Sequence, residues 1–278
     1  MRNELIINII MTVMMAASSL GIVSCESDSN ISINERDALP VMTAFIYPDS
    51  AITVNAYSCV SFFSANDFSP LSEAEVTLSI NGNVYTQHVD SGQISVRFDD
   101  ASATIGDSIF VRVVSDKGTL EAHTQMIEPK PFDLTYQLTD SLVECSVRID
   151  DTADVSDYYQ FMVFADDELV DCYYYDEIFE NAISKTDNQS GYFADGDNDG
   201  RMIRVNFAFD RRLPQSARVR VRLYHHTYEY YQYITGIQTV LNDIVLPVFT
   251  RSNLYSNVAG GLGIVSAMSF VEQEVEVR

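Results

Sequence analysis

The chain of 278 residues has no tryptophan and few basic side chains, with 17 lysines and arginines against 40 aspartates and glutamates. The resulting net charge of −23 repels the phosphate backbone of nucleic acids, and no cluster of Lys and Arg offsets it. We therefore exclude nucleic acid as a partner, and acidic lipid headgroups are equally unfavourable. The lack of tryptophan also argues against a stacking platform for sugars.

The motifs of common catalytic sites are missing as well. There is no H-E-x-x-H zinc motif and no G-x-S-x-G nucleophile motif. His88 and His123 are isolated, whereas His225 and His226 are neighbours at the end of an expected strand, where adjacent side chains point to opposite faces. Carboxylates are numerous enough for a glycosidase pair, but nothing in the sequence positions one. We expect no catalytic residues and no enzymatic activity.

The first residues predict export and attachment of a lipid. Residues 5–17 are almost entirely apolar and follow Arg2, which is typical of a secretion signal. The run leads into Ile22-Val23-Ser24-Cys25, the pattern of a lipobox, in which the thiol of the cysteine accepts diacylglycerol. Two glyceride chains and one amine-linked chain exceed the two anchors that stable membrane attachment needs. We predict a lipoprotein signal peptide at 1–24, cleaved before Cys25, and a lipidated tether at 25–40.

Two alternatives stay open for this segment. Residues 5–23 could cross a bilayer as a helix, since about 20 apolar residues suffice, and the chain could also be a soluble secreted protein. The polar stretch Glu26-Ser27-Asp28-Ser29-Asn30 begins directly after Cys25 and favours the lipoprotein. This acidic, serine-containing stretch resembles the surface-export signal of Bacteroidota lipoproteins, which implies an outer-membrane location that faces the cell exterior.

The remaining residues predict an all-β protein of two antiparallel β-sandwich domains. Short alternating runs fill residues 41–128, and an Asn81-Gly82 turn between two of them is a strong hairpin signal. The two prolines of Pro129-Lys130-Pro131 stop a ladder and stiffen the chain, so a second β-rich domain is expected at 131–278. The strand order of the first domain resembles transthyretin-like or Ig-like repeats, and the second domain opens like a fibronectin-type sandwich.

One short helix is expected in the second domain, near residues 228–241. Thr227 suits the N-cap position because its side chain can accept a hydrogen bond from the first turn. An apolar face at helical spacing is formed by Tyr230, Tyr233, Ile234, Ile237 and Leu241. Residues 270–277 are expected as the last strand, and their alternating charges suit the edge of a sheet.

Besides Cys25, the cysteines are Cys59, Cys145 and Cys172, so at most one disulfide can form among these three. Cys145 and Cys172 lie on two strand-like runs of one predicted domain and could pair, which export permits. Alternatively, all three are buried thiols that act as small apolar side chains. None of their spacings matches a zinc site.

The stretch from Asp195 to Gly200, DGDNDG, begins like a calcium-binding loop. Asp195, Asp197 and Asp199 supply oxygen at positions one, three and five, and a glycine stands at position six. We therefore consider these three aspartates as candidate Ca²⁺ ligands. Position twelve is Asn206 where such loops carry a glutamate, so a polar hairpin turn without a cation is the alternative.

The C-terminal quarter contains the most specific pattern. A helix that begins with the run TYEYYQY at 227–233, which contains the motif Y-x-Y, is followed by a Leu246-Pro247-Val248 segment and then by the run SNVAGGLGIV at 256–265. This order resembles a family of Bacteroidota outer-membrane lipoproteins known as domain of unknown function 4249. The residues that carry the resemblance are Tyr230, Tyr233, Asn257, Gly260, Gly261 and Gly263. Val258 and Val265 replace the isoleucine and the aromatic residue that are usual in the family.

The resemblance implies an accessory role beside a TonB-dependent outer-membrane receptor in nutrient uptake, with no catalytic residues. The three glycines by themselves predict a tight backbone crossing, since a phosphate-binding loop would need a following helix N-terminus. An adhesin or fimbrial structural subunit is the alternative function, because tandem sandwiches with lipoprotein signals also build Bacteroidota fimbriae. In that case Asn34-Glu35-Arg36-Asp37 would be the cleavage point.

Overall fold

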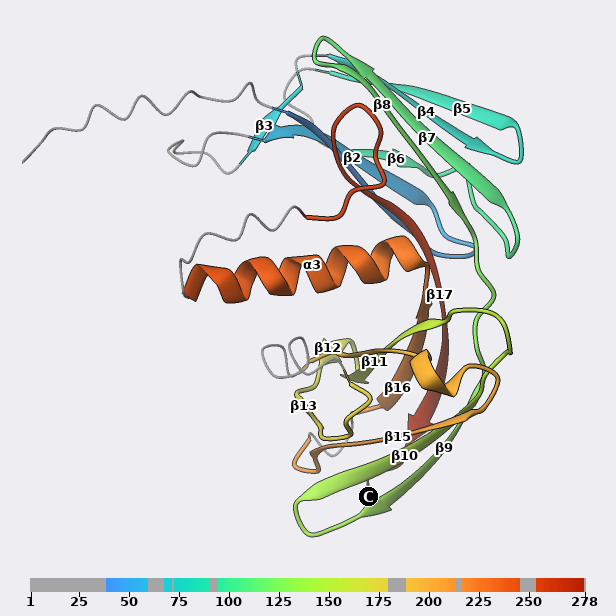
Figure 1. Ribbon diagram of the computed structural model, residues 1–278, viewed down its shortest axis with the longest axis vertical. Helices are drawn as coiled ribbons and strands as arrows, with labels where there is room; N and C mark the ends of the chain where they lie inside the picture. Colours follow the sequence, from blue (N-terminus) through green and yellow to red (C-terminus); the bar gives the residue numbers. More distant parts are fainter. Residues whose placement is uncertain are drawn as a thin grey trace, which may run out of the picture. The chain divides into compact units, whose positions relative to one another are not determined.

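The computed structural model describes residues 39–59, 68–71, 73–90, 95–179, 189–213, 217–245 and 254–277. Within these ranges the chain is all-β with mostly antiparallel sheets and one α-helix, as the sequence predicts (Figure 1). The predicted signal peptide, the tether and the lipidation at Cys25 lie outside the described residues. Among the residues that are described, no helix is both long and apolar enough to span a membrane.

The elements follow one another along the chain with short connections. They are β1 (Pro40–Ile46), β2 (Ile52–Cys59), β3 (Phe68–Pro70), β4 (Ala74–Ile80), β5 (Asn83–Val89), β6 (Ser95–Phe98), β7 (Ser108–Ser115), β8 (Gly118–Gln125), β9 (Phe132–Leu138), β10 (Leu142–Asp150), β11 (Tyr158–Ala165), β12 (Glu168–Leu169), β13 (Cys172–Tyr174), β14 (Gly191–Ala194), the 3₁₀ turn η1 (Gly196–Asn198), β15 (Met202–Asp210), β16 (Val219–His226), α3 (Tyr228–Val245) and β17 (Leu262–Val275).

The first apolar core lies between the antiparallel sheet β5-β4-β7-β8 and the strands β1, β2 and β6. Alternate residues of β4 and β7 are buried in it, as expected for strands with one solvated face. Asn81 and Gly82 join β4 to β5 with φ of 50° and 87°, and two positive φ angles are what a type I′ hairpin turn requires. The hairpin predicted from Asn-Gly is therefore confirmed.

The second core lies between the sheet β13-β15-β10-β9 and the strands β11 and β16. Large aromatic side chains fill it, and Phe161 packs against both Phe193 and Phe207 with ring centroids 5.9 and 5.4 Å apart. Residues 129–131 lie between Met126, which directly follows β8 and is buried in the first core, and Phe132, the first buried residue of the second core. Residues 168–174 form two short strands, β12 and β13.

The last strand, β17, belongs to both cores, which the sequence did not predict. Its first half pairs in parallel with β1, and its second half pairs antiparallel with β16. Val265 and Ala267 are buried in the first core, whereas Val271 and Val275 pack in the second. The predicted domain 131–278 is therefore corrected, because residues 258–267 pack with the first sandwich. The last strand was predicted at 270–277, but β17 already begins at Leu262.

The helix α3 contacts β17 and follows β16 without an intervening loop (Figure 1). It extends four residues beyond the predicted end at 241. Its first turn packs through aromatic rings, since Tyr230 stacks on His226 at 4.2 Å and Tyr231 lies 4.7 Å from Tyr158. Tyr231, absent from the predicted face, is buried. The hydroxyl of Thr227 lies 2.9 Å from that of Ser266, while its carbonyl accepts the first helical hydrogen bond.

The disulfide considered for Cys145 and Cys172 does not form, because both thiols are free and buried. Cys145 lies on β10 opposite Phe207 and Cys172 lies on β13 opposite Phe209, so the strand β15 separates them. Two strand spacings amount to about 10 Å, and a disulfide joins Cα atoms less than about 7 Å apart. The alternative of buried thiols is correct for this pair, and burial raises the pKa of Cys145 to about 12.

The chain enters β17 through a segment that we call the glycine turn. Its members are Asn257, Gly260, Gly261 and Gly263. The side-chain amide of Asn257 donates to the carbonyl of Val265 at 2.8 Å, and its oxygen accepts from the Val265 N–H at 3.0 Å. A Cβ atom on any of the three glycines would lie within 2.3 Å of a carbonyl oxygen of β1 or β8. The structure thus shows the close backbone crossing that the glycines predict.

Candidate functional site

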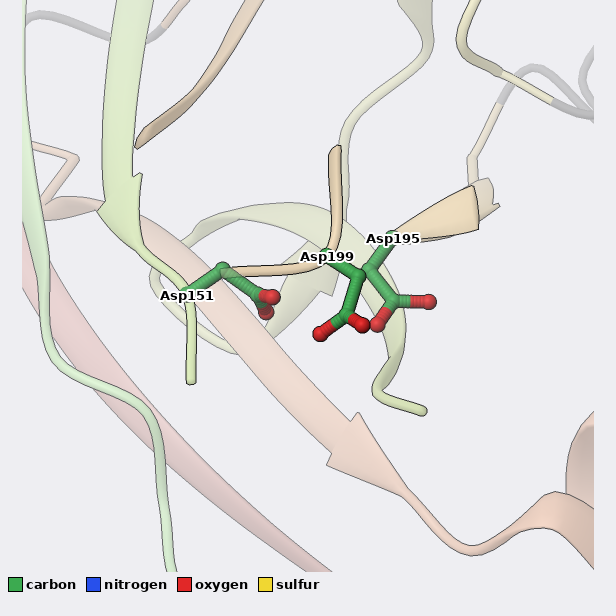
Figure 2. A group of neighbouring side chains, drawn as sticks. All are labelled: Asp151, Asp195 and Asp199. Carbon is green, nitrogen blue, oxygen red and sulfur yellow. The ribbon is translucent and has the colours of Figure 1, made fainter. Parts of the chain in front are cut away.

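Two loops of the second sandwich bring three carboxylates together (Figure 2). Asp151 directly follows β10, Asp195 follows β14, and Asp199 follows the 3₁₀ turn η1. One oxygen from each carboxylate lies within 4.8 Å of the others. Asp195 is buried, Asp151 is half-buried and Asp199 is exposed, so the cluster opens to solvent on one side.

Of the three candidate ligands that the sequence offers, Asp195 and Asp199 belong to this group, and the third member is Asp151, which the sequence did not single out. Asp197 lies within the tight turn η1, is exposed and is not a member of the group. The backbone N–H of Gly200 donates to Asp151 at 3.0 Å, and Gly200 has a positive φ of 69°. This contact between the two loops cannot be read from a spacing of residues within one loop.

Hydrogen bonds fix the orientation of the carboxylates. One oxygen of Asp195 accepts from the Gly196 N–H at 2.7 Å and the other from the Asp157 N–H at 3.1 Å. Burial and the charges of Asp157 and Asp195 raise the pKa of Asp151, against the hydrogen bonds from Gly200 and Tyr159, which lower it. Clustered carboxylate oxygens suit a hard cation such as Ca²⁺. Three protein ligands are fewer than the six to eight oxygens that Ca²⁺ takes, so water or carbonyl oxygens would complete the shell.

A buried polar network lies directly beside the cluster. Asp157 accepts from the Lys130 ammonium at 2.6 Å, and its second oxygen lies 2.9 Å from Nε2 of His225. Nδ1 of His225 lies 2.7 Å from the carbonyl oxygen of Glu128, so both ring nitrogens of His225 face an oxygen atom. Burial opposes ionisation of Asp157, but the hydrogen bonds and charges of His225 and Lys130 lower its pKa to about 2. The network ties the linker at 128–130 to β11 and β16.

His226 points to the opposite face of the sheet from His225, as predicted for neighbouring strand residues. Its Nε2 donates to the side-chain oxygen of Gln160 at 2.8 Å, and its Nδ1 is buried with no partner among the described residues. Burial, together with the charge of His225, lowers the pKa of His226 to about 3. His88 and His123 lie on the first sandwich, far from this network along the chain.

The family of the chain is identified by a match over almost the whole sequence. A family model described as "Domain of unknown function (DUF4249)" matches residues 27–274. The chain belongs to the DUF4249 family. The resemblance drawn from the tyrosines and the glycine turn is therefore confirmed, and the match also covers Asp151, Asp195, Asp199 and the buried network. No curated protein matches the sequence.

Two solved structures are similar to this DUF4249 chain in part. The FN1–FN3 domains of chicken CNTN1 are 14% identical with a TM-score of 0.28, over 69% of this chain and 60% of that one. A segment of two fibronectin type-III domains from chicken tenascin is 10% identical with a TM-score of 0.23, over 67% of this chain and 90% of that one. The chain thus spans 60% of the length of the CNTN1 structure.

Any stabilisation of this chain by calcium is expected to require Asp151 and Asp195 but not Asp197. The reason is that Asp151 and Asp195 offer oxygens to one point, whereas Asp197 lies outside the group. Thermal unfolding with and without calcium would be compared for Asp151→Asn, Asp195→Asn and Asp197→Asn. A calcium-induced shift that Asp197→Asn removes and Asp151→Asn retains would favour the original loop pattern instead.

The stability of the chain is expected to fall as the pH falls from 6.5 towards 3, because His226 is buried as the neutral ring. Its pKa is depressed from 6.5 to about 3, so in this window the unfolded chain binds a proton that the folded chain does not. The full contribution is present above pH 6.5, and its loss is about 1.4 kcal/mol per pH unit below.

Urea unfolding of wild-type and His226→Gln chains at several pH values measures this slope. The variant should show a flatter dependence between pH 6.5 and 4, where the wild-type loss from this one residue is about 3 kcal/mol. His88→Gln is the control, because the His88 side chain is exposed on the first sandwich. Equal slopes for the wild type and His226→Gln would contradict the buried neutral histidine.

Proposed function

We propose that this DUF4249 protein is a lipid-anchored, non-catalytic binding protein of the outer membrane that assists a TonB-dependent receptor in nutrient uptake. The observation that carries the proposal is the lipobox at 22–25, placed directly after an apolar run and before an acidic tether. A lipid on Cys25 would leave residues 39–277 to work outside the membrane. The link to a TonB-dependent receptor comes from what the DUF4249 resemblance implies.

The structure supports a binding role through aromatic side chains on the surface of the second sandwich. Tyr173 and Tyr175 are each 57% exposed on and just after the edge strand β13, whereas Tyr174 packs against Phe179 at 4.9 Å. Tyrosine rings offer a large contact area with a polar tip, and they are enriched in binding interfaces. An edge strand with exposed tyrosines is suited to contact a protein or a ligand at the cell surface.

The lipid anchor is tested by Cys25→Ser, which removes the thiol that accepts diacylglycerol. We expect this variant to lose labelling by a radioactive fatty acid and to leave the membrane fraction or to stay as the uncleaved precursor. Cys59→Ser is the matched control and should be labelled like the wild type, because Cys59 lies on β2 within the folded part. A wild-type chain that takes up no fatty acid would overturn the anchor.

The partner is tested by purifying the tagged, full-length protein from detergent-solubilised outer membranes. A TonB-dependent barrel in stoichiometric amount would support the accessory role, and the substrate of that barrel would then be identified from uptake assays. A ladder of self-polymers, with the chain trimmed after Arg36, would instead support the fimbrial alternative. Unchanged nutrient uptake and no barrel contact after deletion of the gene would contradict the proposal.

A further inference from the structure

The outer face of the sheet β13-β15-β10-β9 carries two arginines directly opposite each other. Arg148 on β10 pairs in register with Arg204 on the antiparallel strand β15, and both side chains are exposed. Like charges in directly opposite positions of neighbouring strands destabilise a sheet. A chain with 17 basic and 40 acidic side chains could easily supply a carboxylate at one of these positions, so the pairing of two arginines needs a reason.

The positive charge of this pair is only half compensated. Asp133 on β9 lies in register with Arg148 and forms an ion pair with it. Arg204 forms no ion pair with any of the described residues, whereas Arg218, just before β16, and Arg220 and Arg222 on β16 each pair with a glutamate of β17. The row from Asp133 through Arg148 to Arg204 therefore ends in an uncompensated guanidinium on a strongly acidic protein.

The two arginines line an open groove of about 550 Å³ that also contains uncharged hydrogen-bonding groups. Its lining residues are Asp133, Leu134, Thr135, Ser146, Arg148, Arg204 and Gln273. Thr135 and Ser146 lie one row along the sheet from the arginines, and the Thr135 hydroxyl donates to the Ser146 carbonyl at 3.3 Å. Ser146 is half-buried in the wall of the groove, and its hydroxyl adds a hydrogen-bonding group beside the arginines.

We propose that this groove binds a small ligand through an oxyanion, a carboxylate or phosphate group, held between Arg148 and Arg204. The planar guanidinium group matches the geometry of both oxyanions and can form two parallel hydrogen bonds to either. A bound oxyanion would offset the repulsion between the opposed arginines and give Arg204 the partner that it lacks. Asp133 competes with the ligand for Arg148, so it sets an upper limit on the affinity.

This site lies on the other side of the β15 sheet from the buried core and does not involve Asp151, Asp195 or Asp199. The inference goes beyond the proposed function and does not rest on it, since binding of a small anion is measured with no membrane or barrel present. If the Cys25→Ser experiment contradicts the lipid anchor, the proposal for the groove is therefore unaffected. If no anion binds, the proposal for the lipid anchor is unaffected.

The test is isothermal titration of the full-length protein with inorganic phosphate and, separately, with glucuronate at low ionic strength, where exposed charges are least screened. Tighter binding of phosphate would identify a phosphate ester as the ligand class, and tighter binding of glucuronate an acidic sugar. For the preferred anion, Arg204→Gln is expected to weaken binding at least about 5-fold, because a hydrogen bond to a charged group is lost. Asp133→Asn is expected to tighten it, because the competing carboxylate is neutralised.

Arg97→Gln is the matched control, since Arg97 is also exposed but lies on β6 of the first sandwich beside Asp99. Thermal unfolding establishes that each variant is folded, which is expected for exposed positions. The inference is overturned if neither anion binds the wild type. It is also overturned if Arg97→Gln weakens binding as much as Arg204→Gln, because the effect would then be one of general charge.

Discussion

Replacing Gly263 by alanine is expected to destabilise the folded chain by more than about 3 kcal/mol. The added Cβ would lie 1.8 Å from the carbonyl oxygen of Met42, the residue opposite Gly263 in the parallel ladder between β1 and β17. Neither the backbone of β1 nor that of β17 can move away without breaking the hydrogen bonds of that ladder. Gly263 also has a φ of 127°, which side chains rarely adopt.

Gly118→Ala separates these two causes. Gly118 has nearly the same φ, 122°, but a Cβ there would meet nothing within 4 Å. Its substitution should therefore cost only the backbone strain, about 1–2 kcal/mol. Urea unfolding of the two variants measures the difference. Similar losses for Gly263→Ala and Gly118→Ala would show that the close approach to Met42 contributes nothing.

The other members of the glycine turn extend the same argument. A Cβ on Gly260 would lie 2.0 Å from the carbonyl oxygen of Thr119, and one on Gly261 would lie 2.3 Å from that of Pro40. The turn therefore presses against β8 and the start of β1 before the chain enters the shared strand. The residues that carry the DUF4249 resemblance in this turn are explained by packing between the end of the chain and the first sandwich.

Local signals predicted much of the architecture, because the structures that they specify are themselves local. Asn81-Gly82 can form a type I′ turn whatever the rest of the chain does, and Pro129 and Pro131 interrupt ladders at any place. Alternation along residues 142–149 or 202–209 likewise identifies a strand with one buried face. The all-β fold and the helix after Thr227 could therefore be predicted.

The pairing partners could not be predicted in this way. An alternating pattern gives the same signal at the edge of a sheet and at its centre, so nothing in residues 262–275 indicates that this strand joins β1 to β16. The carboxylate cluster could not be predicted for the same reason, since Asp151 lies near Asp195 only because two loops meet. The sequence indicates only that Lys130 lies in a linker. In the folded chain Lys130 forms an ion pair with Asp157, 27 positions further along, and no local pattern predicts this contact.

Replacing Asp157 by asparagine is expected to destabilise the chain by about 3–5 kcal/mol at neutral pH, the cost of removing one partner from a buried ion pair. The Asp157 side chain is almost fully buried, and Lys130 and His225 both direct positive or hydrogen-bonding groups at it. Asparagine keeps the shape of the side chain but leaves the Lys130 ammonium without its counter-charge. Asp99→Asn is the control, because its ion pair with Arg97 is exposed and should contribute less than about 1 kcal/mol.

The pH dependence of the same variant distinguishes the lost charge from lost packing. The pKa of Asp157 is lowered from 3.8 to about 2 in the folded chain, so its charge contributes fully above pH 3.8 and is lost as the pH falls through about 2. Chemical unfolding curves of the wild type and Asp157→Asn should therefore be far apart at pH 6 and should converge as the pH approaches 2. A difference in stability that is the same at both pH values would show that shape, and not the charge held by Lys130 and His225, makes Asp157 necessary.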